Sequence, residues 1–434
     1  MGHRQPLDAF VVGAPTRAGG EPPRDLHASG TAARIGRGVV RIRFFSYFYP
    51  PCVGGGEVIL QHQAEELARR GHEVHVHTTP FTNLDGSTEV ASGDSVEGGV
   101  QVHRRPSRWL PGRNPLEKNA VTPAFYADAW LVGDLFVAVG FPSLHLDALV
   151  ARKAAVGGRL VAQNYVTAAF LAEILGGQGG PAKRVRAEYW RRWVKPALAR
   201  ADVVLADSPA AAAGLRDQLG LTNVKLHIGM AVDPAEFDRV SPADVDAVRA
   251  SLGLGAAKLI LAPSRVSRQK GADLLVKAAR PLLEANPGAW KLVIAGAVNE
   301  PDLAAELRRL AEGCPDIVIT ERPRAEQVAL FRAADVVVLP SRGETVGGVV
   351  FEGMYAGALC IVSDGVEAAR DDYLKDGVNG LLVPREDVGA LRKAVDRAMR
   401  EPLSAVRAAG KRMVEERFTW RASVDRLLEL YPRA

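Results

Sequence analysis

The sequence predicts an α/β protein built on two parallel β-sheets, each covered by helices. Short, continuously apolar runs alternate with amphipathic segments along most of the chain, as expected for βα units whose strands are buried on both faces. Two of these runs, 39–45 and 259–263, lead into loops that are rich in glycine or in basic residues. With 434 residues, the chain is long enough for two ordinary domains with separate cores.

Composition excludes several classes of protein. Hydrophobic residues make up 47% and charged residues 24% of the chain, as in a soluble globular protein, and no apolar run reaches the roughly 18 residues of a membrane span. Three scattered cysteines argue against a disulfide framework and favour a reducing, cytoplasmic location. No CxxC or HExxH pattern indicates a metal site. A net charge of +5, without a basic stretch interleaved with aromatic residues, argues against a nucleic-acid partner.

The first half of the chain begins with a tail, 1–38, that is rich in Gly, Pro, Arg and Ala and lacks the apolar core of a signal peptide. We expect this tail to be disordered. After it, strands are predicted at 39–45, 73–78, 135–139, 159–163 and 201–206, the last being the final strand of the first domain. Helices are predicted at 57–70, 143–156 and 209–219. The segment 81–130 is expected to be irregular.

Residues 181–200 allow two interpretations. They contain seven basic residues, one acidic residue and three aromatic residues. A basic amphipathic helix can lie on an anionic membrane surface, so peripheral membrane contact is one interpretation. The other is a solvated helix whose Tyr189, Trp190 and Trp193 cap the core. The ARAD segment that follows directly favours this second interpretation.

The second half alternates in the same way. Strands are predicted at 259–263, 291–296, 317–320, 336–339 and 359–363, with late helices at about 386–400, 402–417 and 420–431.

The stretch 336–363, VVVLPSRGETVGGVVFEGMYAGALCIVS, predicts strand, loop, helix and strand. Gly347 and Gly348 open the helix, where free N–H groups and the positive end of the helix dipole can hold a phosphate. On that helix, the carboxylate of Glu352 can accept two hydrogen bonds from a diol such as a ribose. Glu344 precedes the helix in the loop. A phosphate cradle between two carboxylates suits a nucleotide that carries a second, hydroxyl-rich group.

This segment resembles the E-x7-E segment of retaining glycosyltransferases of family 4, because a strand is followed in order by Pro-Ser, Glu, Gly-Gly and Glu. It departs mildly from the family pattern at Val346 and Gly353. Three other segments also resemble that family, and they occur in the order expected. The YPP-x-VGG-x-E…GHEV pattern lies at 49–74, a GR-x-x-x-x-KG-like motif lies at 264–271 with Ser264 in place of glycine, and the interdomain segment lies at 227–237. The resemblance covers about 39–431.

The resemblance implies the GT-B architecture, in which two Rossmann-like doubly wound domains face each other across a cleft. An acceptor-side domain would comprise 39–232 and a domain that binds the nucleotide sugar 233–418. A terminal segment, 419–434, would pack back on the first domain.

It also implies site roles. Arg265 and Lys270 would hold the diphosphate of a nucleotide diphosphate sugar, which would be the co-substrate, with no other cofactor and no metal. An Arg fork and a Lys point charge at the end of a strand suit that task. Gly347 and Gly348 would donate backbone hydrogen bonds, and Glu352 would bind the ribose. Glu344 would stabilise the charge that develops on the transferred sugar.

Other positions carry weaker implications. Gly54 and Gly55 match the family's Gly-Gly pair that faces the donor phosphate, although an ordinary tight turn would also contain them. Many family members have a histidine at the position of Asn164, so that role is not carried over. We interpret His145 as a histidine on a helix face and Arg268 as a solvated cation.

The function implied is retaining, metal-independent transfer of a hexose-like sugar to a polysaccharide, lipid or antibiotic-type acceptor. Two alternatives remain open. One is a sugar-nucleotide epimerase of the same fold, and the other is a non-catalytic subunit that binds a partner.

Overall fold

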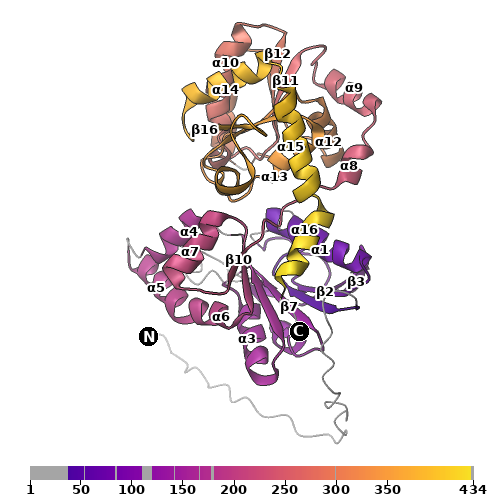
Figure 1. Ribbon diagram of the computed structural model, residues 1–434, viewed down its shortest axis with the longest axis vertical. Coiled ribbons are helices and arrows are strands. Elements are labelled where there is room, and N and C mark those ends of the chain that lie inside the picture. The colour runs from indigo at the N-terminus through magenta and orange to yellow at the C-terminus, as the bar shows by residue number, and fades with distance from the viewer. Residues whose placement is uncertain are drawn as a thin grey trace, which may run out of the picture.

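The computed structural model describes residues 38–431, except 53, 84–85, 110–119, 141, 166, 177–179 and 299. It forms two lobes, each built on one large sheet, with the chain passing between them (Figure 1). The predicted disordered tail lies outside the described residues apart from Gly38. In the part of the chain that the structure describes, no helix is both long and apolar enough to cross a bilayer.

The first sheet has eight strands in the order β10-β9-β8-β7-β1-β2-β4-β3. Its strands are β1 Arg41–Phe45, β2 Glu73–Thr78, β3 Gly93–Glu97, β4 Val100–Arg104, β7 Leu135–Val139, β8 Arg159–Gln163, β9 Val203–Ala206 and β10 Val224–Leu226. All neighbours pair in parallel except β3 and β4. Strand order reverses between β1 and β7, so the sheet is doubly wound, as predicted.

Two predictions about the strands of this half are wrong. The segment 81–130 is not irregular, because it contains β3, β4, the short pair β5 Arg108–Trp109 and β6 Ala120–Val121, and the helix α2 Ala124–Asp128. Strand β3 is largely exposed and polar, and β4 alternates in burial, so neither shows a continuous apolar run. The 201–206 strand is not the last, because the three-residue edge strand β10 follows it.

Helices of this half are α1 Gly55–Arg69, α3 Leu144–Val156, α4 Ala168–Leu175, α5 Pro181–Tyr189, α6 Lys195–Arg200 and α7 Pro209–Leu219. A π-helical turn, η1 Trp190–Val194, joins α5 to α6. Through this turn Trp190 and Val194 face the core, whereas Trp193 is 69% exposed. The prediction that Trp193 caps the core is therefore wrong.

The second sheet has six parallel strands in the order β13-β12-β11-β14-β15-β16. They are β11 Lys258–Ala262, β12 Trp290–Ala295, β13 Ile317–Thr320, β14 Val336–Leu339, β15 Leu359–Ser363 and β16 Leu381–Val383. Successive residues of β11 and β14 enter two different core clusters, so both faces are buried. Strand order reverses between β11 and β14, and such a switch point is where doubly wound sheets bind ligands.

The helices of the second half are α8 Pro234–Asp238, α9 Pro242–Ser251, α10 Ala272–Glu284, α11 Pro301–Ala311, α12 Arg324–Ala333, α13 Gly348–Ala356, α14 Val388–Arg400, α15 Ser404–Arg417 and α16 Trp420–Leu430. They cover both faces of the second sheet, apart from α16, which runs from this lobe onto the first and packs on α1 (Figure 1).

The chain crosses between the two sheets twice, and the two crossings are bonded together. The Val232 N–H donates to the Phe418 carbonyl at 2.7 Å, and the Trp420 N–H donates to the Val232 carbonyl at 3.2 Å. The Ser423 hydroxyl of α16 donates to the Gly229 carbonyl at 3.1 Å. The domain limits 39–232, 233–418 and 419–434 stay a prediction from the sequence.

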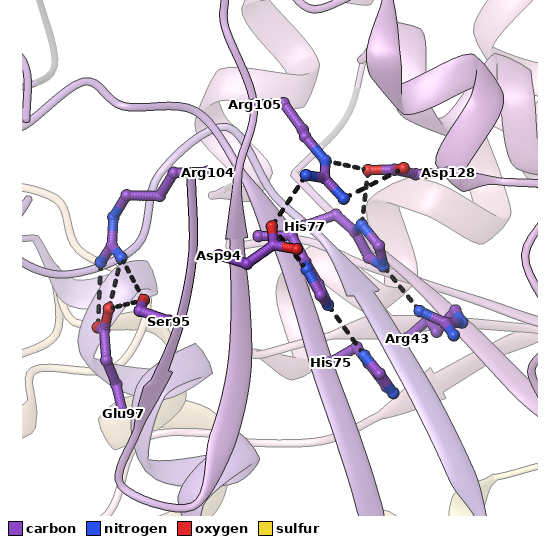
Figure 2. A network of polar contacts seen from close by, with 10 residues as sticks. Arg43, His75, His77, Asp94, Ser95, Glu97, Arg104, Arg105 and Asp128 are labelled. Atoms are coloured by element: carbon purple, nitrogen blue, oxygen red, sulfur yellow. Dashed lines mark hydrogen bonds and ion pairs between the residues drawn. The ribbon is translucent and has the colours of Figure 1, made fainter. Parts of the chain in front are cut away.

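A polar network covers part of one face of the first sheet (Figure 2). His77 on β2 is fully buried, with its Nδ1 2.8 Å from Asp128 and its Nε2 3.1 Å from the Arg43 guanidinium. Because a guanidinium only donates, Nε2 is the acceptor and Nδ1 carries the proton. His77 is therefore neutral and doubly hydrogen-bonded. Burial lowers the pKa of His77 to about 4, although Asp128 opposes the shift.

The lowered pKa of His77 predicts that the folded protein loses stability as the pH falls. An unfolded histidine titrates near 6.5, so between about pH 6.5 and pH 4 the unfolded chain binds a proton that the folded chain does not. Stability supplied by neutral His77 is present above that window and is lost as the pH falls through it, by on the order of 3 kcal/mol. Urea unfolding of the wild type and of His77→Gln, at a series of pH values from 7.5 to 4.5, should show a shallower fall for the variant.

Asp128, in the same network, loses its contribution to stability in a separate, more acidic pH range. The pKa of Asp128 is lowered to about 2, against its burial, by its hydrogen bonds to His77 and Arg105, so its contribution is lost only below about pH 4. Asp94, His75, His103 and Arg105 complete the cluster. If the wild type and His77→Gln lose stability in parallel between pH 6.5 and 4.5, His77 does not cause the acid sensitivity.

Candidate active site

Loops that follow the adjacent strands β11 and β14 are in direct backbone contact. Gly271 ends the first loop with φ at +72°, a region that favours glycine. A Cβ at this position would lie 2.2 Å from the Pro340 carbonyl oxygen. Only glycine therefore lets the Lys270-Gly271 turn approach the Pro340-Ser341 turn this closely.

Arg342 joins the same two loops. Its N–H donates to the Gln269 carbonyl at 2.7 Å, and its guanidinium forms a fork on the Asp273 carboxylate at 2.8 and 2.9 Å. Asp273 is almost fully buried. Its burial favours the neutral acid, but the hydrogen bond and charge of Arg342 outweigh that effect and lower its pKa. Sequence reasoning missed this pair, although both charges stand just beyond adjacent strands.

The two loops bring together Lys270 and Glu344. The Lys270 ammonium forms an ion pair with Oε1 of Glu344, and the Ser341 hydroxyl donates to Oε2 at 3.1 Å. Only 12% of the lysine side chain and 18% of the glutamate side chain are exposed. The residues predicted to hold the diphosphate and to stabilise the sugar thus contact each other directly.

Arg265 differs from the cations around it. It lies in the loop after β11 and is exposed, and its guanidinium has no hydrogen bond or ion pair within the described part of the chain. Arg268 in the same loop is also exposed but pairs with Glu306 at 2.7 Å, as suits a solvated surface cation. Arg265 therefore offers an unpaired positive charge at the switch point of the second sheet.

The predicted phosphate cradle is the start of α13. Gly347 caps the helix with φ at +75°, and a Cβ on it would lie 2.6 Å from Leu339 Cδ2. At Gly348, a Cβ would lie 2.9 Å from the Met230 side chain. The positive φ favours glycine at 347, and a Cβ at 348 would displace the Met230 side chain. The first N–H groups of any α-helix have no acceptor within it, so the start of α13 offers free donors.

The start of α1, in the first lobe, lies across from this cradle. Gly54 caps α1, and a Cβ on Gly55 would lie 3.8 Å from the same Met230 side chain. Two helices opened by glycine therefore meet around one residue of the interdomain segment. The carboxylate of Glu57 already lies beside Gly54, with Oε2 2.2 Å from where a Cβ would be, and its burial raises the pKa of Glu57. Contact of Gly54 and Gly55 with a donor phosphate stays a prediction.

Glu352 lies on α13 and is paired with a residue that sequence reasoning missed. Its Oε1 is 2.6 Å from the Arg324 guanidinium, which also contacts Glu236 at 2.6 Å. Burial raises the pKa of Glu352, and the charge of Arg324 opposes that shift. A carboxylate has about four acceptor positions, so Glu352 retains acceptor capacity for a diol.

Two positions of the first lobe show no catalytic arrangement. His145 is fully buried on α3, with Nε2 3.0 Å from the Val139 carbonyl. Asn164 follows β8 and accepts a hydrogen bond from the Tyr165 N–H at 2.8 Å. The interpretation of His145 as a histidine of the helix face agrees with this packing.

Comparison with known proteins agrees with this geometry. The family model of the glycosyl transferases group 1 matches residues 257–401, and that of glycosyltransferase family 4 matches residues 53–228. A D-inositol 3-phosphate glycosyltransferase of Kineococcus radiotolerans is 31% identical over 422 residues, which cover 88% of this chain and 91% of that protein.

Solved structures share the fold. A sucrose-phosphate synthase of Thermosynechococcus elongatus aligns with a TM-score of 0.69 at 22% identity, covering 90% of this chain and 97% of its own. The Anabaena protein HepE, solved in complex with UDP-glucose, aligns with a TM-score of 0.65 at 19% identity, covering 90% and 98%. The fold, the order of the site loops and the relatives together show that the chain belongs to glycosyltransferase family 4 and has the GT-B fold.

Proposed function

We propose that this protein transfers a sugar from a nucleotide diphosphate sugar to a hydroxyl group, with retention of configuration at the anomeric carbon and without a metal ion. The observation that carries the proposal is the cluster at the β11–β14 switch point. An unpaired arginine, a Lys–Glu pair and a glycine-opened helix end lie on adjacent loops there. HepE was solved with UDP-glucose, which supports a nucleotide sugar as donor.

In this proposal, Arg265 and Lys270 neutralise the diphosphate as the bond between the anomeric carbon and the phosphate oxygen breaks. The diphosphate leaves with the electron pair, and the acceptor oxygen bonds to the same face of the carbon. The acceptor's proton passes to the leaving phosphate. Lys270 would exchange its Glu344 partner for the phosphate, which frees the Glu344 carboxylate to stabilise the developing positive charge.

The acceptor is proposed from the relatives. Relatives such as that of Kineococcus radiotolerans are named D-inositol 3-phosphate glycosyltransferases, which favours a small phosphorylated polyol over a polysaccharide, a lipid or an antibiotic precursor. Release of nucleoside diphosphate from a panel of sugar nucleotides, with and without inositol 3-phosphate, tests both substrates. Configuration of the product by NMR tests retention. Conversion of the donor without an acceptor would instead indicate an epimerase.

The first prediction from the proposed function concerns the leaving group. Arg265→Ala and Lys270→Ala each remove a charge-assisted contact to the diphosphate and should lower kcat/KM by about 10² or more. Arg268→Ala is the matched control, because this exposed cation of the same loop pairs with Glu306 instead. It should retain near-wild-type kcat/KM. Near-wild-type turnover in both test variants, with unchanged circular dichroism, would remove Arg265 and Lys270 from the site.

The second prediction separates the two glutamates. The ribose does not change during the reaction, so Glu352→Gln should mainly raise the donor KM. Charge develops on the sugar only in the transition state, so Glu344→Gln should mainly lower kcat. Calorimetry of donor binding and steady-state kinetics measure the two effects. The reverse pattern would show that the two roles are assigned wrongly.

We also propose that the 181–200 surface contacts an anionic membrane. Trp193 is exposed beside Arg191 and Arg192, and an exposed Trp among basic residues suits an interface of anionic headgroups. Cosedimentation with vesicles of phosphatidylglycerol and phosphatidylcholine in equal parts should show binding that vesicles of phosphatidylcholine alone do not support.

Trp193→Ser should weaken this binding several-fold. Trp130→Ser is the matched control, because Trp130 is also exposed, at 52%, but lies outside the 181–200 segment. Equal binding of the two variants would exclude Trp193 from any membrane contact.

A further inference from the structure

Glu367 makes hydrogen bonds from the second lobe to the first. It follows β15, at the start of the helical turn that continues into the π-helical η3 Ala369–Tyr373, and is only 9% exposed. Its Oε1 accepts from the Ala168 N–H at 3.0 Å, and its Oε2 accepts from the Ser208 hydroxyl at 2.7 Å. Both donors follow strands of the first sheet, Ala168 after β8 and Ser208 after β9. This carboxylate therefore binds the two halves of the molecule together.

These donors stand at the starts of two helices. Ala168 is the first residue of α4, where its N–H has no partner within the helix, and Ser208 is the N-cap of α7. Negative charge is favoured at helix N-termini, where the dipoles of α4 and α7 converge on Glu367. The second lobe thus supplies an acceptor for the first N–H of α4 and for the Ser208 hydroxyl, which itself caps α7 by accepting from the Ala211 N–H.

The backbone of Glu367 is hydrogen-bonded to the loop between β14 and α13, which carries Glu344. Its N–H donates to the Glu344 carbonyl at 2.9 Å, and the Glu344 N–H donates to the Gly365 carbonyl at 3.0 Å. The Ala368 N–H donates to the Thr345 carbonyl at 2.8 Å. One residue therefore anchors Glu344 through its main chain and reaches the first lobe through its side chain.

Asp207 adds a second contact at the same place. It precedes Ser208 and is 3% exposed. Burial raises the pKa of Asp207 to about 7; the neighbouring Thr345, the residue after Glu344, opposes that shift, and the charge of Glu367 adds to it. The two carboxylates reach across the interface in opposite directions. The Asp207 carboxylate of the first lobe lies near Thr345 of the second lobe. The Glu367 carboxylate of the second lobe accepts hydrogen bonds from Ala168 and Ser208 of the first lobe.

We infer that Glu367 is a positioning residue that couples engagement of the two domains to the placement of Glu344, an inference that rests on the proposed role of Glu344 in sugar transfer. When the domains engage, the hydrogen bonds from Ala168 and Ser208 to Glu367 fix the 365–368 segment. The backbone hydrogen bonds of that segment then fix residues 344–345. When the domains separate, Glu367 loses both partners and the Glu344 backbone loses that support. Glu344 would then be correctly placed only in the engaged state, which limits hydrolysis of the donor by water.

The kinetic test compares Glu367→Ala and Glu367→Gln with Asp371→Asn. Asp371 is the matched control, a carboxylate four positions along the same segment that pairs with the neighbouring Arg370. We expect kcat to fall by about tenfold or more in Glu367→Ala, and by less in Glu367→Gln, which keeps shape and one acceptor oxygen. The donor KM should change little, because the proposed donor contacts of the second lobe are intact. An unchanged kcat, or a loss seen only in KM, would overturn the inference.

Hydrogen exchange followed by mass spectrometry tests the coupling without any substrate. In Glu367→Ala, peptides that contain Ala168 and peptides that contain Glu344 should both exchange faster than in the wild type and in Asp371→Asn. If Ala168 exchanges faster while Glu344 does not, Glu367 is a cap only and the inference fails. Because this measurement needs no turnover, it separates failure of the inference from failure of the proposed function. Glu367→Gln provides the same comparison should Glu367→Ala not fold.

Discussion

The close approach of Gly271 to the Pro340 carbonyl is the contact on which the rest of the site depends. It brings the loop after β11 against the loop after β14, at the point where the strand order of the second sheet reverses. The Arg342 fork on Asp273 then fixes that approach, because a buried carboxylate requires its guanidinium partner. A side chain at position 271 would separate the loops and, with them, Lys270 and Glu344.

Positive and negative groups of the site neutralise one another in the absence of a ligand. Glu344 is paired with Lys270, and Glu352 with Arg324, at positions largely shielded from solvent. Partly buried carboxylates would be costly without such partners. A bound nucleotide sugar would therefore exchange partners within an existing set of charges, rather than enter a site of uncompensated ones. In the proposed mechanism, Arg265, which is exposed and unpaired in the described part of the chain, would meet an incoming diphosphate without that exchange.

The two lobes are held by contacts of different kinds. On one side, the chain itself connects the two lobes. There the crossing segments at Val232 and Phe418 are joined by backbone hydrogen bonds, and α16 packs on α1. On the other side, Glu367 accepts hydrogen bonds from Ala168 and Ser208 of the first lobe, and Asp207 lies near Thr345 of the second. The join at the crossing segments therefore includes the chain itself, whereas the contacts beside the Glu344 loop are polar side-chain contacts.

Local patterns in the sequence determined the parallel strands at 135–139, 336–339 and 359–363, because strands buried on both faces are largely apolar throughout. The strands at 73–78, 159–163 and 317–320 were also predicted, although polar residues such as His75 and His77 interrupt the first of them. Those patterns also located the loops that carry the candidate site. Strands β3 and β10 were missed because an exposed edge strand needs no apolar run, and Trp193 was misplaced because a π-helical turn is not visible in a periodicity.

The partners of the site residues were decided by the tertiary structure alone. Lys270 and Glu344 are 74 positions apart, and Ala168 and Glu367 are 199 positions apart. A sequence read locally identifies the charge at each of these positions. Which charge meets which depends on the order of the strands and on how the two sheets face each other, and both are properties of the folded chain.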